Sequence, residues 1–174
     1  MTDFFNIDYL KSGTEKQKEA FETLNNHLIF QRLSPFTPVL VGTFPININV
    51  ASSDLDIACH WQNKQEFIDL ITNEFSVETN FQFIEKEISG YETVIANFYL
   101  NHFEIEIFGQ NIPVHNQNGF LHMIIEDKIL KEKGEDFRQQ IIALKQNGLK
   151  TEPAFAQLLH LDGNPYEALL KYKV

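Results

Sequence analysis

Two aspartates separated by a single residue, Asp54 and Asp56, are the residues best placed to do chemistry. They lie in an apolar segment that favours a β-strand, and side chains alternate between the two faces of a strand. Both carboxylates therefore point to one face, while Leu55 and Ile57 pack into the core on the other. Carboxylates about 6–7 Å apart by backbone rise repel each other unless a cation lies between them. Hard divalent cations such as Mg²⁺ prefer carboxylate oxygens and accept water and phosphate as further ligands, so the pair predicts a metal site.

A later strand-like segment, residues 103–107, offers a third carboxylate for such a site. Glu104 and Glu106 alternate with apolar residues in it, so both point to one face, together with His102. A half-buried strand whose polar residues simply face water has the same pattern. The pattern therefore leaves Glu104 and Glu106 as alternatives, and it is more typical of a partly exposed strand histidine than of a ligand at position 102.

A glycine with nearby hydroxyl groups precedes the aspartates and could bind phosphate. Gly42 follows a buried apolar strand, and a glycine there lets backbone N–H groups approach a phosphate closely. The hydroxyl groups of Thr43, Ser52 and Ser53 could add hydrogen bonds. Taken alone, however, Gly42 could merely end its strand, and Ser53 could be an ordinary turn residue.

The pattern of the whole chain indicates which elements position these residues. A capping-box motif at Thr14 begins a helix that ends before Pro35, and Asn63 begins a second helix. We expect strands over residues 38–42, 54–59, 81–88, 94–100 and 103–108, the last three joined as antiparallel hairpins. The stretch 44–53 is ambiguous between strand and turn. Helical patterns begin at Gly119 and cover residues 135–146, 152–161 and 165–172.

This order predicts an α/β (α+β) fold, a mixed sheet with flanking helices and a helical C-terminal region. We expect an α/β core over residues 1–112 and a helical region over residues 113–174 that packs on it.

The segment from Gly42-Thr43 to Ser53-Asp54-Leu55-Asp56-Ile57 resembles the signature of the DNA polymerase beta-like nucleotidyltransferase superfamily. That signature is a strand ending in Gly-Gly or Gly-Ser, then a strand with two alternating acidic residues, then a later strand with a third carboxylate. The first Asp lies 12 residues after Gly42, as in the common small nucleotidyltransferases. The chain as a whole more closely resembles a bacterial family of uncharacterised nucleotidyltransferase-like proteins, over residues 42–57, 103–110 and 150–155.

The resemblance implies a reaction and a role for each matching residue. Asp54 and Asp56 would hold Mg²⁺ or Mn²⁺ bridging the phosphates of a nucleoside triphosphate. Glu106, with Glu104 as the alternative, would complete the metal site or act as a base toward the acceptor. Gly42, Thr43 and Ser53 would bind the phosphates. The implied function is transfer of a nucleoside monophosphate to a small-molecule or protein acceptor.

Several positions depart from the family pattern. Thr43 replaces the usual Ser, Asn47 replaces a Gly often found five residues after the first, and Pro45 lies within the loop. The third carboxylate is Glu where Asp is frequent, and no motif assigns a triphosphate-binding Lys or Arg. These departures favour an alternative function, a catalytically inactive binding module of antitoxin-like or regulatory type. Metal-dependent phosphate-ester hydrolysis by the same acids is a further alternative.

The composition of the chain limits which partners and which cellular location we expect. The net charge is -10 and only two residues, Arg32 and Arg138, are arginine, so we expect no long nucleic acid as a partner. Because Cys59 is the single cysteine, the chain has no internal disulfide. We interpret its side chain as a small apolar group on the buried side of its strand. Without an apolar run of membrane-spanning length or a secretory signal pattern at the first residues, we expect a cytoplasmic protein, a monomer or a dimer.

Charged groups of the helical region are expected mainly on its surface. His122 and Glu126 are four residues apart on a helix and are interpreted as a surface pair. Six basic residues could reach a triphosphate from these helices, although solvated helix faces are the favoured interpretation: Lys128, Lys131, Lys133, Arg138, Lys145 and Lys150.

Overall fold

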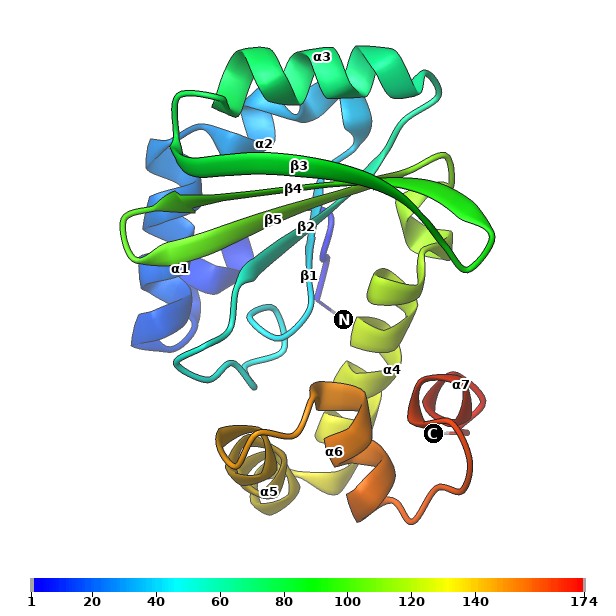
Figure 1. Ribbon diagram of the computed structural model, residues 1–174. Coiled ribbons are helices and arrows are strands. Elements are labelled where there is room, and N and C mark those ends of the chain that lie inside the picture. Colours follow the sequence, from blue (N-terminus) through cyan, green and yellow to red (C-terminus); the bar gives the residue numbers. More distant parts are fainter. Residues whose placement is uncertain (1, 174) are drawn as a thin grey trace.

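A five-stranded mixed sheet with strand order β1-β2-β5-β4-β3 forms the centre of the computed structural model, which describes residues 2–173 (Figure 1). β2 and β5 are parallel, and the other neighbouring strands are antiparallel, so the expected mixed sheet and hairpins are confirmed. The strands are β1 (Val39–Val41), β2 (Leu55–His60), β3 (Thr79–Ile88), β4 (Tyr91–Leu100) and β5 (Phe103–Gln110).

Tight turns join the three antiparallel strands. Ser89 and Gly90, between β3 and β4, have φ values of 55° and 82°, and Asn101, between β4 and β5, has a φ of 54°. Two-residue hairpin turns need this left-handed backbone, which glycine and asparagine adopt most readily. The two turns thus place β3, β4 and β5 side by side as an antiparallel half of the sheet.

Three helices pack on one face of the sheet: α1 (Glu15–Asn26), α2 (Ile29–Arg32) and α3 (Lys64–Phe75), with short 3₁₀ turns η1 (Asp8–Ser12) and η2 (Ser34–Phe36). The expected capping box is present, because Thr14 accepts from the Gln17 backbone N–H while the Gln17 side chain accepts from the Thr14 backbone N–H. Asn63 caps α3 in a similar way. Phe75 stacks on Phe98 of β4 with ring centroids 4.9 Å apart, which anchors α3 to the sheet.

The chain after β5 is helical and forms a second apolar cluster. It comprises η3 (Val114–Asn116), α4 (Asn118–Lys133), α5 (Glu135–Gln146), α6 (Thr151–Leu158) and α7 (Pro165–Leu170). Val39 and Val41 of β1 pack with Met123 of α4 and Phe155 of α6 in this cluster. In Figure 1, α5, α6 and α7 gather on the side of the sheet away from α3, and α4 connects them to it.

Two local expectations differ from the structure. The first long helix ends at Asn26 instead of continuing toward Pro35, because Leu28 adopts a φ of 54° and breaks it, leaving its side chain 52% exposed. The ambiguous stretch 44–53 forms turns and no strand. Phe44, Ile46 and Ile48 are buried there, so apolar burial holds the loop in place of sheet pairing.

Within the described residues, no helix has the length and apolar character needed to cross a membrane. The outermost residues of the two expected segments, 1 and 174, lie outside the described part of the chain.

Candidate active site

The three predicted acids lie side by side on two neighbouring interior strands of the sheet, β2 and β5. Asp54 directly precedes β2, and Asp56 lies on it. In the parallel pairing of β2 with β5, Asp56 stands opposite Glu106, and neighbouring strands are about 4.8 Å apart. Asp54, Asp56 and Glu106 all line one cleft of about 590 Å³ between the sheet and the C-terminal helices. The fold therefore brings together acids that are about fifty residues apart in sequence.

Burial first, and then mutual repulsion, disfavour the ionised forms of these carboxyl groups. Burial, followed by the charges of Asp54 and Glu106, raises the pKa of Asp56 well above its ordinary value. Burial and the charge of Asp54 raise the pKa of Glu106, and burial is also the main cause of the raised pKa of Asp54. A divalent cation between the carboxylates would relieve this repulsion and favour their ionised forms.

Glu104, the alternative third acid, has a different environment. Its Oε2 accepts a hydrogen bond of 2.9 Å from the Tyr99 hydroxyl, on the same face of the sheet but outside the cleft. Glu106 instead lies in the cleft, where Asn97 approaches its Oε2 at 3.5 Å. The geometry therefore favours Glu106 over Glu104 as the partner of the two aspartates.

Gly42 lies directly against the aspartates. Its φ of 74° is a left-handed conformation that disfavours any residue with a side chain. A Cβ atom at this position would also overlap the Asp56 carboxylate, so the close approach of backbone to carboxylate requires glycine. Thr43 and Ser53 line the same cleft. The Ser53 Oγ accepts a hydrogen bond of 2.9 Å from the Val50 N–H, which fixes the turn that leads into Asp54.

The loop after Gly42 is held from two sides. Asn47, at the position where the superfamily often has glycine, adopts a φ of 54°, so the departure from the pattern keeps the left-handed turn. The Gln17 Nε2 of α1 donates to the Phe44 carbonyl at 2.8 Å. From the opposite side, the Arg138 guanidinium of α5 donates to the carbonyl groups of Ile46 and Asn47. Arg138 is therefore a positioning residue for the loop.

Helices α4, α5 and α6 form the opposite wall of the cleft, and the interpretation of two of its residues as a surface pair was wrong. His122 and Glu126 of α4 are only 7% and 2% exposed, because the other C-terminal helices cover α4. The sequence held a partial signal, because five of the six residues 120–125 at the start of α4 are apolar. The charged residues that follow in the helix hide this signal at Glu126.

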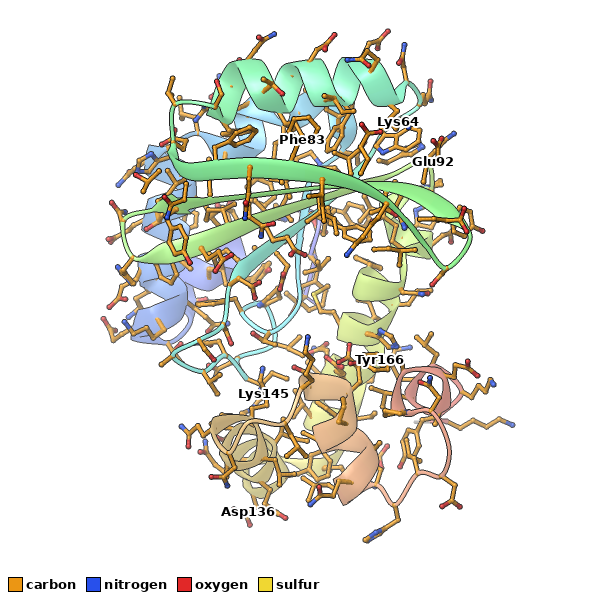
Figure 2. All side chains as sticks on the ribbon, viewed as in Figure 1. Lys64, Phe83, Glu92, Asp136, Lys145 and Tyr166 are labelled. Carbon is orange, nitrogen blue, oxygen red and sulfur yellow. The ribbon has the colours of Figure 1, made fainter. Side chains whose placement is uncertain are left out.

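Lys145 of α5 was also expected on a solvated helix face, and this expectation was wrong. It is 9% exposed and lines the cleft on the side of α5 nearest the sheet (Figure 2). Burial lowers the pKa of Lys145 to about 8, although the charges of the surrounding acids, first Glu126 and Glu152, oppose this change. Lys150 lines the same cleft, and its charge favours the ionised form of Asp54. Two cations thus face the three acids.

The other candidate residues lie elsewhere. His102 is in the β4–β5 turn, where its Nε2 is 3.5 Å from Glu19 of α1, so it does not belong to the strand face of Glu106. Cys59 is buried in the core, as expected for an apolar filler. Lys131 pairs with Asp127 on the exterior of α4, as expected for a solvated helix face.

The chemistry of the donor set fits a hard divalent cation. Across residues 2–173, no three His, Cys, Asp or Glu side chains already surround a point where a metal ion could bind. Asp54 and Asp56 alone can offer two carboxylates, and Mg²⁺ commonly takes its remaining ligands from water and substrate phosphates. The residues therefore fit a metal whose remaining ligands are water or phosphate oxygens.

Comparisons with known proteins agree with this geometry. The sequence model of a protein family described as "Domain of unknown function (DUF4269)" matches residues 22–172. No curated protein matches the chain in sequence.

Solved structures of nucleotidyltransferases resemble the chain in fold. The Cid1 poly(U) polymerase bound to Mg 3′-dATP is 14% identical over 94% of this chain and 52% of that one, with a TM-score of 0.56. The polymerase core of TRAMP is 13% identical over 94% of this chain and 50% of that one, with a TM-score of 0.53. The GLD-2/RNP-8 complex is 15% identical over 87% and 60%, also at 0.53. The chain thus has a nucleotidyltransferase-like fold and spans about half the length of these relatives.

Proposed function

The chain belongs to the family described as domain of unknown function DUF4269, and we propose that it is a metal-dependent nucleotidyltransferase. It would transfer a nucleoside monophosphate from a nucleoside triphosphate to a small-molecule or protein acceptor. The observation that carries the proposal is the placement of Asp54, Asp56 and Glu106 beside Gly42 in one cleft.

Each residue has a role in this proposal. Asp54 and Asp56 would hold Mg²⁺ or Mn²⁺, which, when bound, neutralises charge on the phosphates. The backbone at Gly42 and the hydroxyl groups of Thr43 and Ser53 would orient the triphosphate. Lys145 and Lys150 would contact its oxygens from the helical wall, and they supply the cations that no sequence motif assigns.

Glu106 would complete the metal site or accept the proton of the acceptor hydroxyl. A bond forms between the acceptor oxygen and the α-phosphorus, the bond from that phosphorus to the bridging oxygen breaks, and pyrophosphate leaves.

The charge of the chain supports a small molecule or a protein as acceptor. Similar structures include an RNA terminal uridylyl transferase and the polymerase core of an RNA surveillance complex. This chain, in contrast, has a net charge of -10 and two arginines, one of which holds the glycine loop. Binding of a long RNA backbone depends on many Lys and Arg contacts, so we favour acceptors without a long phosphate backbone.

Calorimetry with Mg²⁺ and a non-hydrolysable ATP analogue tests the proposal. The double variant Asp54→Asn with Asp56→Asn should fold and lose metal-dependent binding, because both carboxylates are removed while their mutual repulsion is relieved. The double variant Glu85→Gln with Glu92→Gln is the matched control, since it also removes two acids from the sheet, where they pair with Lys64 outside the cleft. Equal binding by the aspartate double variant and the control would refute the site. Labelled triphosphates incubated with cell extract would then identify the nucleotide and the acceptor.

A catalytically inactive binding module, antitoxin-like or regulatory, is the second candidate. It is favoured by the finding that no group of three acids or histidines in residues 2–173 is ready to hold a metal. This candidate predicts nucleotide binding that does not change with Mg²⁺ and no transfer of label to any acceptor.

A further inference from the structure

Glu126 is a buried carboxyl group that the proposed transfer chemistry does not use. It lies on α4, is 2% exposed and lines the cleft. Within residues 2–173 its Oε1 has no hydrogen-bond partner. An unpartnered buried carboxyl oxygen is costly, and such a group facing a cleft indicates a ligand that supplies the missing donor.

Glu152 of α6 extends the acidic character of this wall. Its Oε1 lies 3.6 Å from the His122 Nδ1. The His122 Nε2 is 3.0 Å from the carbonyl of Tyr166, a residue of α7 (Figure 2). A carbonyl only accepts, so this nitrogen carries a proton. The imidazole is thereby fixed with its other nitrogen toward Glu152. Burial, together with the charge of Glu152, raises the pKa of Glu126 to about 8, so the two acids are close enough to repel each other.

The nearest cation does not satisfy these acids. Lys145 interacts with Glu126 and Glu152 and also with Asp54 and Asp56, yet it forms no ion pair within 4.0 Å of any described carboxylate. In the proposed function its ammonium group contacts the triphosphate, which draws it toward the sheet side of the cleft. Glu126 and Glu152 then remain without a cationic partner on the helical side.

The charge of the whole cleft indicates the kind of ligand. Five carboxyl groups line it, against the ammonium groups of Lys145 and Lys150. A nucleoside triphosphate and its accompanying divalent ions largely neutralise one another, so they leave this excess of acidic groups in place. A neutral hydroxyl group could donate to the Glu126 oxygen but would leave burial favouring the uncharged carboxyl group. An ammonium group has three donors, and its positive charge also favours the ionised forms of Glu126 and Glu152.

We infer that Glu126 and Glu152 bind an ammonium group of the acceptor, so that the acceptor is a small molecule with an amine in addition to the hydroxyl group that receives the nucleotide. The role of this ligand as the acceptor rests on the proposed function. Binding of an ammonium group by Glu126 and Glu152 can be tested without metal or nucleotide.

The probes are two small molecules of similar size, 1,3-diaminopropan-2-ol and glycerol. Each is titrated into the ¹⁵N-labelled full chain, and amide shifts are followed by NMR. We expect the diamine to move signals of α4 and α6 residues near Glu126 and Glu152, whereas glycerol does not. Loss of one charge-assisted contact in Glu126→Gln should weaken diamine binding about tenfold. Glu152→Gln should also weaken it.

The matched control is Glu132→Gln, which removes an acid from the exterior of the same helix, where it pairs with Lys133. This variant should bind the diamine as the unchanged protein does. The inference is overturned if glycerol binds as well as the diamine, if neither binds, or if Glu126→Gln and Glu132→Gln have equal affinity.

Binding of the Mg²⁺–ATP analogue is measured in the same variants and separates the two proposals. Glu126→Gln should keep that binding. If the unchanged protein shows no metal-dependent binding of the ATP analogue, the proposed function is refuted. The diamine titration would still show whether the ammonium subsite exists.

Discussion

Replacement of Gly42 by alanine tests whether the close contact between loop backbone and carboxylate builds the site. The new residue would have to adopt a φ near 74°, which costs an L-amino acid about 1–2 kcal/mol. Its Cβ would also overlap the Asp56 carboxylate, so either the loop or Asp56 must move. We therefore expect Gly42→Ala to lower the free energy of unfolding by about 2 kcal/mol. It should also weaken metal-dependent triphosphate binding about tenfold.

Gly90→Ala is a matched control for the backbone cost. Gly90 has a φ of 82° in the β3–β4 turn, and a Cβ there would meet no atom within 4 Å. This variant should lose about 1–2 kcal/mol by the same conformational argument and keep its triphosphate affinity. Urea denaturation gives the stabilities, and calorimetry with Mg²⁺ and the ATP analogue gives the affinities. If Gly42→Ala and Gly90→Ala behave alike in both assays, the contact with Asp56 does not shape the site.

Two further predictions concern the helical wall. Between pH 4.5 and about 8 the folded protein holds a proton on Glu126 that the unfolded chain releases. The free energy of unfolding therefore falls as the pH rises through this range, by a few kcal/mol at most. Urea denaturation at pH 5 and pH 8 should therefore show Glu126→Gln gaining stability over the unchanged protein at pH 8; an equal pH dependence of the two would contradict the burial argument. Lys145→Met should weaken triphosphate binding about tenfold without loss of stability, because a charge-assisted contact is lost while a buried ammonium group is removed. Calorimetry should find Lys131→Met, on the exterior of α4, unchanged, and equal affinities for the two variants would exclude Lys145 from the phosphate contacts.

The sheet side of the site could be predicted because its signals are local. Alternation along a strand sets the direction of Asp54 and Asp56 before any tertiary contact is known, and the same holds for Glu104 and Glu106. What alternation cannot supply is the neighbour of each strand. The choice between the two glutamates needed the parallel register of β2 and β5, in which Asp56 faces Glu106, and the hydrogen bond from Tyr99 that occupies Glu104.

The helical side could not be predicted in the same way, because burial of a charged side chain depends on which helices pack over it. Glu126 and Lys145 have the spacing of ordinary surface residues within their own helices. Only the packing of α4, α5, α6 and α7 against one another buries Glu126 and turns Lys145 toward the cleft. The end of the first helix could not be predicted either. Leu28 ends it by adopting a left-handed backbone, and no glycine or proline in the sequence marks this position.

Helix α5 connects the two sides of the cleft. Arg138 and Lys145 are seven residues apart, about two helical turns, so they lie on one face of the helix. Arg138 holds the loop that follows Gly42, and Lys145 faces the carboxylates that Gly42 lies against. The boundary expected after residue 112 therefore separates segments that line a single cleft. Because one rigid helix face both orients the loop and supplies a cation, a shift of α5 would change phosphate contacts and loop position together, and the cleft depends on both segments for its shape and its charge.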